Sequence, residues 1–482
     1  MMRLGSAIVA FAALAVAGCS AISAARRAQS AAESTAAGER ADALERIDLA
    51  DQDLAGLVGF ALTNRPSVVR ARLAVEEARL ALKTLAADAP LLSATPWTAP
   101  SVSVRGGFSG AESSQDLHQA VRTHRGTLSA ALSIDLLVWD FGRYGAKAEA
   151  QREQVIAAEQ ELVETGYTVF EGVTSACFSL FERDALLDVA LTNEFEFALH
   201  LEQAEKRVEV GEAQDLDVLK ARLDLARARE ETLAASNAVV TAAAELACAL
   251  GLEASEVERE DMLPRAKDAL REVRQGFAAT AAGAEELYAF ARTNAPVSRI
   301  ARARLRAASA GVDAAIADLL PEVSVSASLS WTDPMWAYQW GASAVQSLFR
   351  GFRKTTAVDL ARVSLERAKA DVVRVEQELS RDIELAVAER DNAREAQVRA
   401  EESLRQAREN FDVVRSRYDV GEASRIDFVT AITAMAEAMG GAVRAFYSGQ
   451  RAEAAIFKLT GEYPVFDERM VDTHRPMQGR KR

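Results

Sequence analysis

Apolar residues recur at every seventh position along two stretches of the chain. The first series is Val155, Leu162, Val169 and Ala176, and the second is Leu365, Val372, Leu379 and Ala386. Helices that pack as coiled coils repeat with this period. Neither stretch contains a proline, which would interrupt a helix. The pattern predicts two long helices, over about residues 142–210 and 352–420.

Each long helix is expected to turn back into a second helix. The tetrapeptide Val210-Gly211-Glu212-Ala213 recurs as Val420-Gly421-Glu422-Ala423. Glycine supplies the backbone freedom that a tight reversal at a helix end needs. The returning helices are predicted over about 214–251 and 424–461. Heptads alone leave an ordinary coiled-coil dimer open as an alternative.

A second period, of two residues, occupies the segments between the helices. Apolar residues from Val323 to Trp331 alternate with four serines, Ser324, Ser326, Ser328 and Ser330. Such alternation gives a strand one apolar and one hydroxyl-bearing face. Strands are predicted over about 100–108, 126–138, 321–331 and 336–346. Aromatic residues gather on the last two: Trp331, Trp336, Tyr338 and Trp340.

Strands of this length and pattern, rimmed by tryptophan and tyrosine, are typical of a transmembrane β-barrel. The alternative is a soluble sheet that caps the helices. Four strands cannot close around a lumen, and open strand edges are not tolerated in lipid. We therefore expect three copies to pool twelve strands around a serine-lined lumen. The predicted fold class is a mixed membrane β-barrel with a long α-helical coiled-coil barrel, with four strands per protomer.

The chain is a tandem duplication. Trp139 recurs as Phe349 and Arg143 as Arg353, and the two turn tetrapeptides share the same spacing of 210 residues. Nearer the N-terminus Phe60-Ala61 recurs as Phe290-Ala291, with a spacing of 230. We assign a first repeat to 45–265, a second repeat to 266–465 and a basic tail to 466–482.

The N-terminus has the pattern of an export signal that ends at a lipidation site. A charged start and an apolar run precede Ala17-Gly18-Cys19. This resembles the lipobox of bacterial lipoproteins, in which the cysteine receives a diacylglycerol and an N-acyl chain. An ordinary cleaved signal with an incidental cysteine is the alternative. The predicted segments are a signal peptide over 1–18 and a lipidated linker over 19–44.

Composition narrows the range of functions. A formal charge of −14 argues against non-specific nucleic-acid binding. No metal-spaced set of histidines and cysteines, Ser/His/Asp order or nucleotide-binding loop is present, so we expect no enzyme, no metal and no cofactor other than the lipid. Cys177 and Cys248 lie in apolar helical stretches and are expected to be buried free thiols. The four histidines are scattered: His118, His124, His200 and His474.

The order of these elements resembles the TolC-like outer-membrane factor family, in its lipoprotein branch. The resemblance rests on the paired turns and on the strand-to-helix junctions, whose residues include Trp139, Gly142 and Arg143 in the first copy and Phe349, Gly351 and Arg353 in the second. It implies a homotrimeric duct that joins an outer-membrane barrel to an α-helical barrel across the periplasm. It also implies a periplasmic adaptor protein and an inner-membrane transporter, proton-driven by preference.

The resemblance also implies functional residues at the helix turns. Asp217, Tyr418 and Asp427 match positions of the family's periplasmic aperture, although both aspartates are also explained as helix N-terminal residues favoured by the helix dipole. Ala423 stands where some relatives carry a clasping arginine, and Arg425 is a candidate replacement. The tips, which would contact the adaptor, are Val210, Gly211, Val420 and Gly421.

The predicted function is a passive exit duct for small molecules, gated at its helix tips. A lipid-tethered periplasmic coiled coil without a pore is one alternative. The exit duct of a type I protein secretion system is another. An enzyme is the class that the sequence favours least.

Overall fold

The described part of the chain contains the same order of elements twice. The computed structural model describes residues 54–87, 89–90, 101–111, 125–210, 214–252, 283–332, 335–346 and 352–461. The first copy comprises α2 (Leu54–Asn64), α3 (Pro66–Ala87), β1 (Ser101–Ala111), β2 (Arg125–Trp139), α4 (Arg143–Glu209) and α5 (Asp215–Leu250). The second comprises α7 (Ala284–Asn294), α8 (Pro296–Ala317), β3 (Glu322–Thr332), β4 (Met335–Val345), α9 (Arg353–Asp419) and α10 (Arg425–Thr460).

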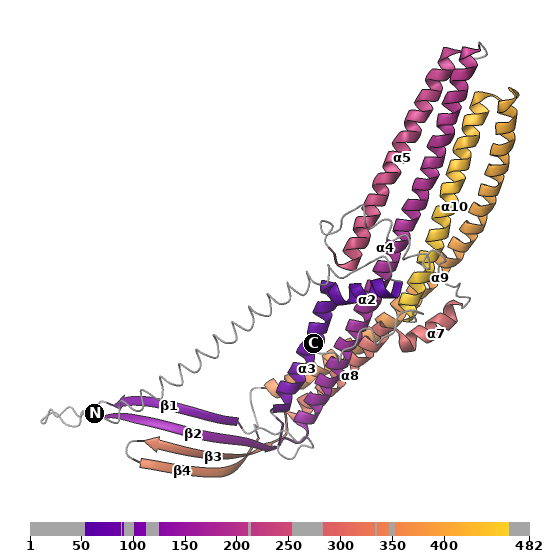
Figure 1. Cartoon of the computed structure of the whole chain (residues 1–482). Helices are drawn as coiled ribbons and strands as arrows, with labels where there is room; N and C mark the ends of the chain where they lie inside the picture. The colour runs from indigo at the N-terminus through magenta and orange to yellow at the C-terminus, as the bar shows by residue number, and fades with distance from the viewer. Residues whose placement is uncertain are drawn as a thin grey trace.

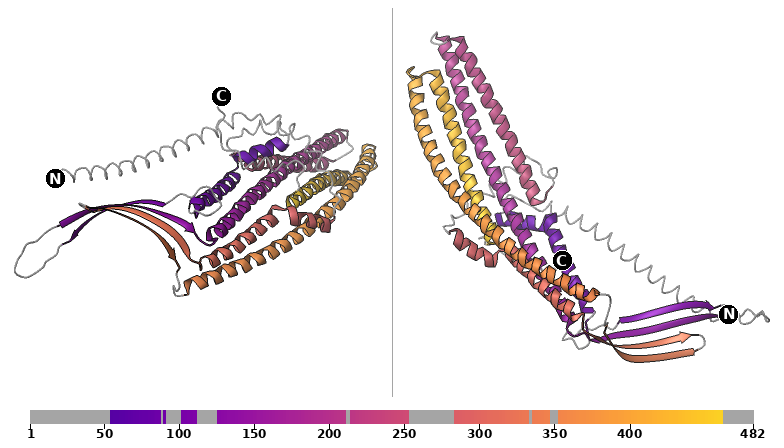
Figure 2. Two further views of the ribbon diagram at one scale, coloured as in Figure 1. Left: turned by 90° about the horizontal axis from the view of Figure 1, so that it is seen from below. Right: turned by 180° about the vertical axis from the view of Figure 1, so that it is seen from behind.

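Corresponding helices of the two copies have equal lengths. Both α4 and α9 have 67 residues, and both α5 and α10 have 36. The molecule is elongated, with the sheet at one end and the turns of the two long hairpins at the other (Figure 1). The short helices α2 and α7 lie about midway along the helical part (Figure 2). The chain is therefore mostly helical with one small sheet.

The four strands form one antiparallel sheet in the order β1-β2-β3-β4. Its register aligns residues of one kind across the sheet, since directly paired residues share a face. Ser103, Ser133, Ser328 and Gln339 form one row, and Ile134, Ala327 and Trp340 form another on the opposite face. Serine side chains bond along the polar face, with Oγ atoms 2.6 Å apart at Ser103–Ser133 and 3.0 Å apart at Ser324–Ser343.

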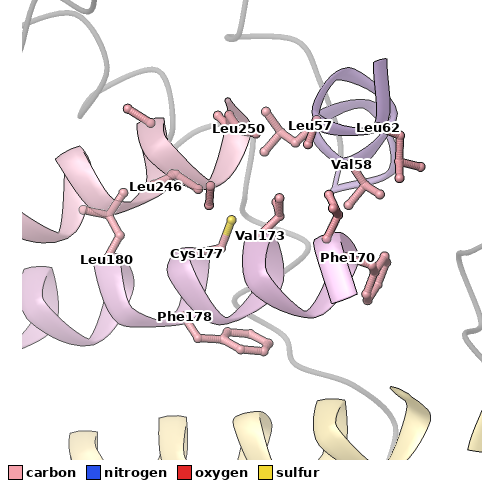
Figure 3. Packing of buried hydrophobic residues seen from close by; sticks show 14 of the residues in the cluster. Leu57, Val58, Leu62, Phe170, Val173, Cys177, Phe178, Leu180, Leu246 and Leu250 are labelled. Atoms are coloured by element: carbon pink, nitrogen blue, oxygen red, sulfur yellow. The ribbon is translucent and has the colours of Figure 1, made fainter. Parts of the chain in front are cut away.

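The long helices pack through small and apolar side chains. The central helix α4 contacts α5, α8, α10 and α3. Of the heptad residues, Leu162, Val169, Leu379 and Ala386 are buried. The largest core cluster lies where α2 crosses α4 and α5, and its phenylalanines Phe170, Phe178 and Phe181 are each 1% exposed. Figure 3 shows the sulfur of Cys177 on the side of α4 that faces Leu246 and Leu250 of α5, with Phe178 on the opposite side of α4.

Only one of the two helical cysteines is buried. Cys177 lies in the core cluster as expected, but the expectation for Cys248 was wrong, because that residue is exposed. Its neighbours Leu246, Ala247 and Leu250 occupy the face of α5 that packs on the core. Cys248 falls outside that stripe, so its apolar surroundings in sequence do not bury it.

The two thiols should differ sharply in reactivity. Burial raises the pKa of Cys177 to about 12, so the reactive thiolate is almost absent at pH 8. Iodoacetamide should modify Cys248 in the folded protein and Cys177 only after denaturation, as measured by mass spectrometry of peptides. In a Cys248→Ala variant, labelling of Cys177 before unfolding would contradict this core packing.

Candidate functional site

The candidate site lies where the two long hairpins turn. Helix α9 ends in a Schellman cap, in which Gly421 N–H donates to Tyr418 O (3.1 Å) and Glu422 N–H to Arg417 O (2.8 Å). Gly421 has a φ of 79° there, the left-handed conformation that favours glycine. Val210 and Val420 are 70% and 71% exposed, so each turn presents an apolar side chain to its surroundings. Gly211 lies outside the described residues.

The two predicted aspartates both cap helices. The carboxylate of Asp217 accepts from Gln214 N–H (3.4 Å), and that of Asp427 accepts from Ser424 N–H (3.3 Å). The Ser424 hydroxyl in turn accepts from Asp427 N–H (3.2 Å). Each aspartate is thereby held in the first turn of its helix, where the dipole also favours a carboxylate. The helix-capping explanation of these residues is therefore sound, whatever else they do.

Arg425 connects the two hairpins. From the start of α10 its guanidinium reaches Asp224 of α5, with Nη1 to Oδ2 at 3.1 Å, and lies 4.0 Å from Asp217. The side chains of Arg425 and Asp224 are only 22% and 18% exposed. Because both side chains are partly shielded from water, this charge-assisted hydrogen bond is stronger than one on the open surface. At Ala423, where some relatives carry a clasping arginine, the small side chain only adds to the neighbouring apolar cluster.

An aromatic cluster lies beside this ion pair. The rings of Tyr418 (α9) and Phe428 (α10) stack with centroids 4.5 Å apart and an interplanar angle of 2°. Arg207 of α4 lies over the Tyr418 ring at 4.3 Å and donates to the Tyr418 carbonyl at 2.6 Å. Burial raises the pKa of Tyr418. Tyr418 therefore lies within the contact between the two hairpins rather than on an open surface.

His200 of α4 completes the cluster. Its ring lies 5.6 Å from Tyr418 and 5.4 Å from Phe428, measured between centroids. Burial, helped by the nearby Arg425, lowers its pKa to about 4. The burial of His200 could not be predicted from the sequence, because the position 210 residues on is Asn410 and the duplication carries no matching histidine.

The strand-to-helix junctions also bring the two copies together. Arg143, at the start of α4, forms ion pairs with Asp318 (3.3 Å) and Glu322 (3.0 Å) of the second copy. The carboxylate of Asp140 accepts from Gly142 N–H (3.2 Å) and Tyr144 N–H (2.6 Å), so it caps α4. Sequence reasoning missed Asp318 and Glu322, because a pairing across copies leaves no mark in a local motif. It also gave no role to Asp140, although a carboxylate just before a helix is a local capping signal.

The second junction differs from the first. Arg353 is exposed, and Phe352, with a φ of 64°, takes the left-handed conformation that Gly142 takes in the first copy. Trp139 packs edge-on against Phe141, with centroids 6.1 Å apart. Phe349 and Gly351 lie outside the described residues, as does Cys19.

The four aromatic residues of β3 and β4 share one face. Trp331 is paired with Trp336, and Leu329 with Tyr338, while Trp340 is paired with Ala327. Trp336, Tyr338 and Trp340 are exposed along β4, which is an edge strand. They lie on the face opposite the serine row. In the part of the chain that the structure describes, no three histidine, cysteine or acidic residues gather as a metal site would require.

Comparison with known proteins assigns the family. Residues 57–252 and 287–462 match the model of a family described as Outer membrane efflux protein. The match covers more than half of the chain, so the chain belongs to the outer membrane efflux protein family. The predicted resemblance to TolC-like outer-membrane factors is thereby confirmed. Among curated proteins, none matches the chain.

Solved structures share the fold at low sequence identity. CusC, described in terms of transmembrane channel formation, is 18% identical with a TM-score of 0.71, over 85% of this chain and 92% of that one. The outer membrane protein VceC of Vibrio cholerae is 18% identical with a TM-score of 0.69, over 85% and 96%. The outer membrane channel CmeC of Campylobacter jejuni is 16% identical with a TM-score of 0.71, over 86% of both chains.

Arg425 and Asp224 should be energetically coupled. In a double-mutant cycle, Arg425→Ala and Asp224→Ala should show a coupling of about 0.5–3 kcal/mol, because the pair is partly shielded from water. The free energy of unfolding of the detergent-solubilised protein gives this value. The matched control is the solvated pair Lys206–Glu202, 2.6 Å apart on one helix, which should show no measurable coupling. Equal coupling in the two pairs would contradict a special role for Arg425.

Proposed function

We propose that this protein is the outer-membrane channel of a tripartite efflux system. In this proposal it is a passive homotrimeric duct that carries small molecules across the periplasm and outer membrane. A periplasmic adaptor joins it to an inner-membrane transporter, which is proton-driven. The observation that carries the proposal is the sheet, whose register places hydroxyls on one face and aliphatic and aromatic side chains on the other. Family membership supports it.

The sheet needs partners to function in a membrane. Strands β1 and β4 are its two edges, and the unpaired backbone groups of an edge cannot be left in lipid. Pairing β4 of one protomer with β1 of the next satisfies both edges at once. Three protomers then give a closed barrel of twelve strands, with serines inside and Trp336, Tyr338 and Trp340 outside.

The helices supply a second reason for assembly. A stretch of 18 residues in each of α5 and α10 is apolar enough to cross a membrane by length and composition, yet only 33% and 22% of it is buried. In a helical barrel, neighbouring protomers cover such faces, so that the duct continues beyond the membrane. In this proposal the duct is closed at the helix turns, where Arg425 and the aromatic cluster hold the two hairpins together. Lipidation at Cys19 would add an anchor.

The barrel should hold the chain in the membrane without the lipid. In a Cys19→Ser background we compare Ala327→Arg with Ser328→Arg, adjacent residues at the centre of β3 whose side chains lie on opposite faces. The Ala327→Arg substitution places a charge in the bilayer, which should cost about 2–4 kcal/mol and reduce the amount of membrane-embedded trimer. The Ser328→Arg substitution places the charge in water and should leave that amount unchanged. Alkaline extraction of membranes followed by gel analysis of trimers measures this. Release of the Cys19→Ser protein itself would favour the tethered coiled coil.

The tips should be needed for export but not for assembly. A Cβ at Gly421 meets nothing within 4 Å, although its φ of 79° strains most residues. Gly421→Arg should abolish the resistance to toxic compounds that the protein restores to a strain lacking it, because a bulky charge blocks the adaptor contact. Gly421→Asn is the control, since asparagine tolerates this backbone and is small. Trimers should form in both variants, and full resistance with Gly421→Arg would count against docking at this turn.

A further inference from the structure

His200 of α4 packs against a stacked pair of aromatic rings in the other hairpin. It lies against Tyr418 of α9 and Phe428 of α10 and is 1% exposed. Neither ring nitrogen has a hydrogen-bond partner among the described residues. Buried polar groups are ordinarily hydrogen-bonded, so a histidine with two unpaired nitrogens is an unusual choice for this position. Burial without hydrogen bonds favours the neutral ring over the charged one at this position.

The titratable groups around His200 come from all four long helices. Arg207 lies on α4, Asp217 and Asp224 on α5, Tyr418 on α9, and Arg425 on α10. One turn before His200, Glu196 of α4 accepts from Arg415 of α9 at 3.3 Å. Asp224 is already bonded to Arg425, and Asp217 already caps α5. A proton on His200 would be repelled by the guanidinium groups of Arg425 and Arg207 and attracted by the carboxylates of Asp224 and Asp217, which already have other partners; burial outweighs this attraction and disfavours the charged ring.

We propose that His200 is an acid-sensitive latch that holds the helix tips closed when neutral and releases them when protonated. The inference rests on the proposed function, because it assumes that separation of the α4–α5 and α9–α10 hairpins opens the duct. An imidazolium gains by reaching water, and it reaches water only if its ring leaves the stacked pair of Tyr418 and Phe428. Leaving that pair removes an apolar contact between the hairpins.

The direction of the effect follows from linkage. In the closed state the neutral ring is favoured, with a pKa lowered to about 4, whereas a ring in water has a pKa of about 6.5. The contribution of His200 to closure is therefore complete above about pH 6.5 and is lost as the pH falls towards 4. Within that window each unit of acidification shifts the open-to-closed ratio by up to about tenfold.

The test is the conductance of the purified full-length trimer in planar bilayers at pH 7.5 and pH 5.0. The open-to-closed ratio should rise by about tenfold or more at pH 5.0. Hydrogen exchange of backbone amides near His200, Tyr418 and Phe428, corrected for the intrinsic rate, should show loss of protection over the same range. An unchanged ratio with unchanged protection would overturn the latch, and so would tighter closure in acid.

Two variants and one control assign the response to His200. His200→Gln and His200→Phe cannot titrate, so both should remain closed at pH 5.0; a full acid response in either folded variant would overturn the latch. The second substitution keeps an aromatic ring in the cluster and the first keeps a polar side chain, which separates titration from packing. The control is the triple variant His118→Gln/His124→Gln/His474→Gln, which changes every other histidine of the chain and should keep the acid response. Loss of that response in the control would overturn the assignment to His200.

Arg425→Ala separates failure of the latch from failure of the gate. It removes the ion pair between hairpins but leaves His200 in place, so it should raise the open fraction already at pH 7.5. If Arg425→Ala opens the duct and acid does not open the wild type, the latch is wrong and the gate stands. If neither change opens the duct, the proposed gate at the tips is wrong and the latch with it.

Discussion

The register of the four-stranded sheet is the constraint on which the rest of the molecule depends. Since side chains alternate with a period of two, a slip of one residue would exchange the faces of a strand and place serines among tryptophans. The paired rows from Ser103 to Gln339 and from Ile134 to Trp340 show that no such slip occurs there; the register shifts only at the end of β2, between Leu137 and Trp139. In the membrane setting that we propose, closure with further copies satisfies both the faces and the edges of this sheet. The helices that leave the sheet would then continue the closed barrel as a ring.

The duplication gives each protomer two equivalent helical hairpins, and the two copies differ in the residues that join the hairpin tips. The two copies share helix lengths, but the residues that join their tips are not repeated. The positions equivalent to Arg425, Asp224 and His200 are Asp215, Ala434 and Asn410. Each of these contacts between the two hairpins therefore occurs once in a protomer and has no counterpart related by the duplication.

The sequence was sufficient to predict the helices and strands but not the contacts between them. The heptads and the alternating serines mark α4, α9 and β3 to within a few residues, because helix and strand periods are local properties. The role of Arg143 in pairing with Asp318 and Glu322 could not be inferred, since those residues are far apart in the chain. Cys248 shows the same limit at short range, because burial depends on which face of a helix meets a neighbour.

The site shows why a residue type alone was a poor guide. Scattered histidines gave no reason to single out His200, whose significance comes from Tyr418 and Phe428 of another hairpin. By contrast, Asp217 and Asp427 were found from the turn motif, and the structure gives both a capping role. The aperture function assigned to them by resemblance remains a prediction, because a capping role within one protomer does not test a charged ring formed by several protomers.

In the proposed function the duct opens at the tips while the rest of the helical part stays closed, and the distribution of contacts between the helices is consistent with this. Midway along the helices, Arg451 pairs with Glu182 at 2.7 Å and Lys458 with Glu171 at 2.6 Å, both between α10 and α4. The largest core cluster surrounds the same region. The cluster at the tips is smaller and contains a histidine without hydrogen bonds. Local stability follows the density of buried apolar contacts, so the hairpins should separate first at their turns and pivot about the ion-paired middle.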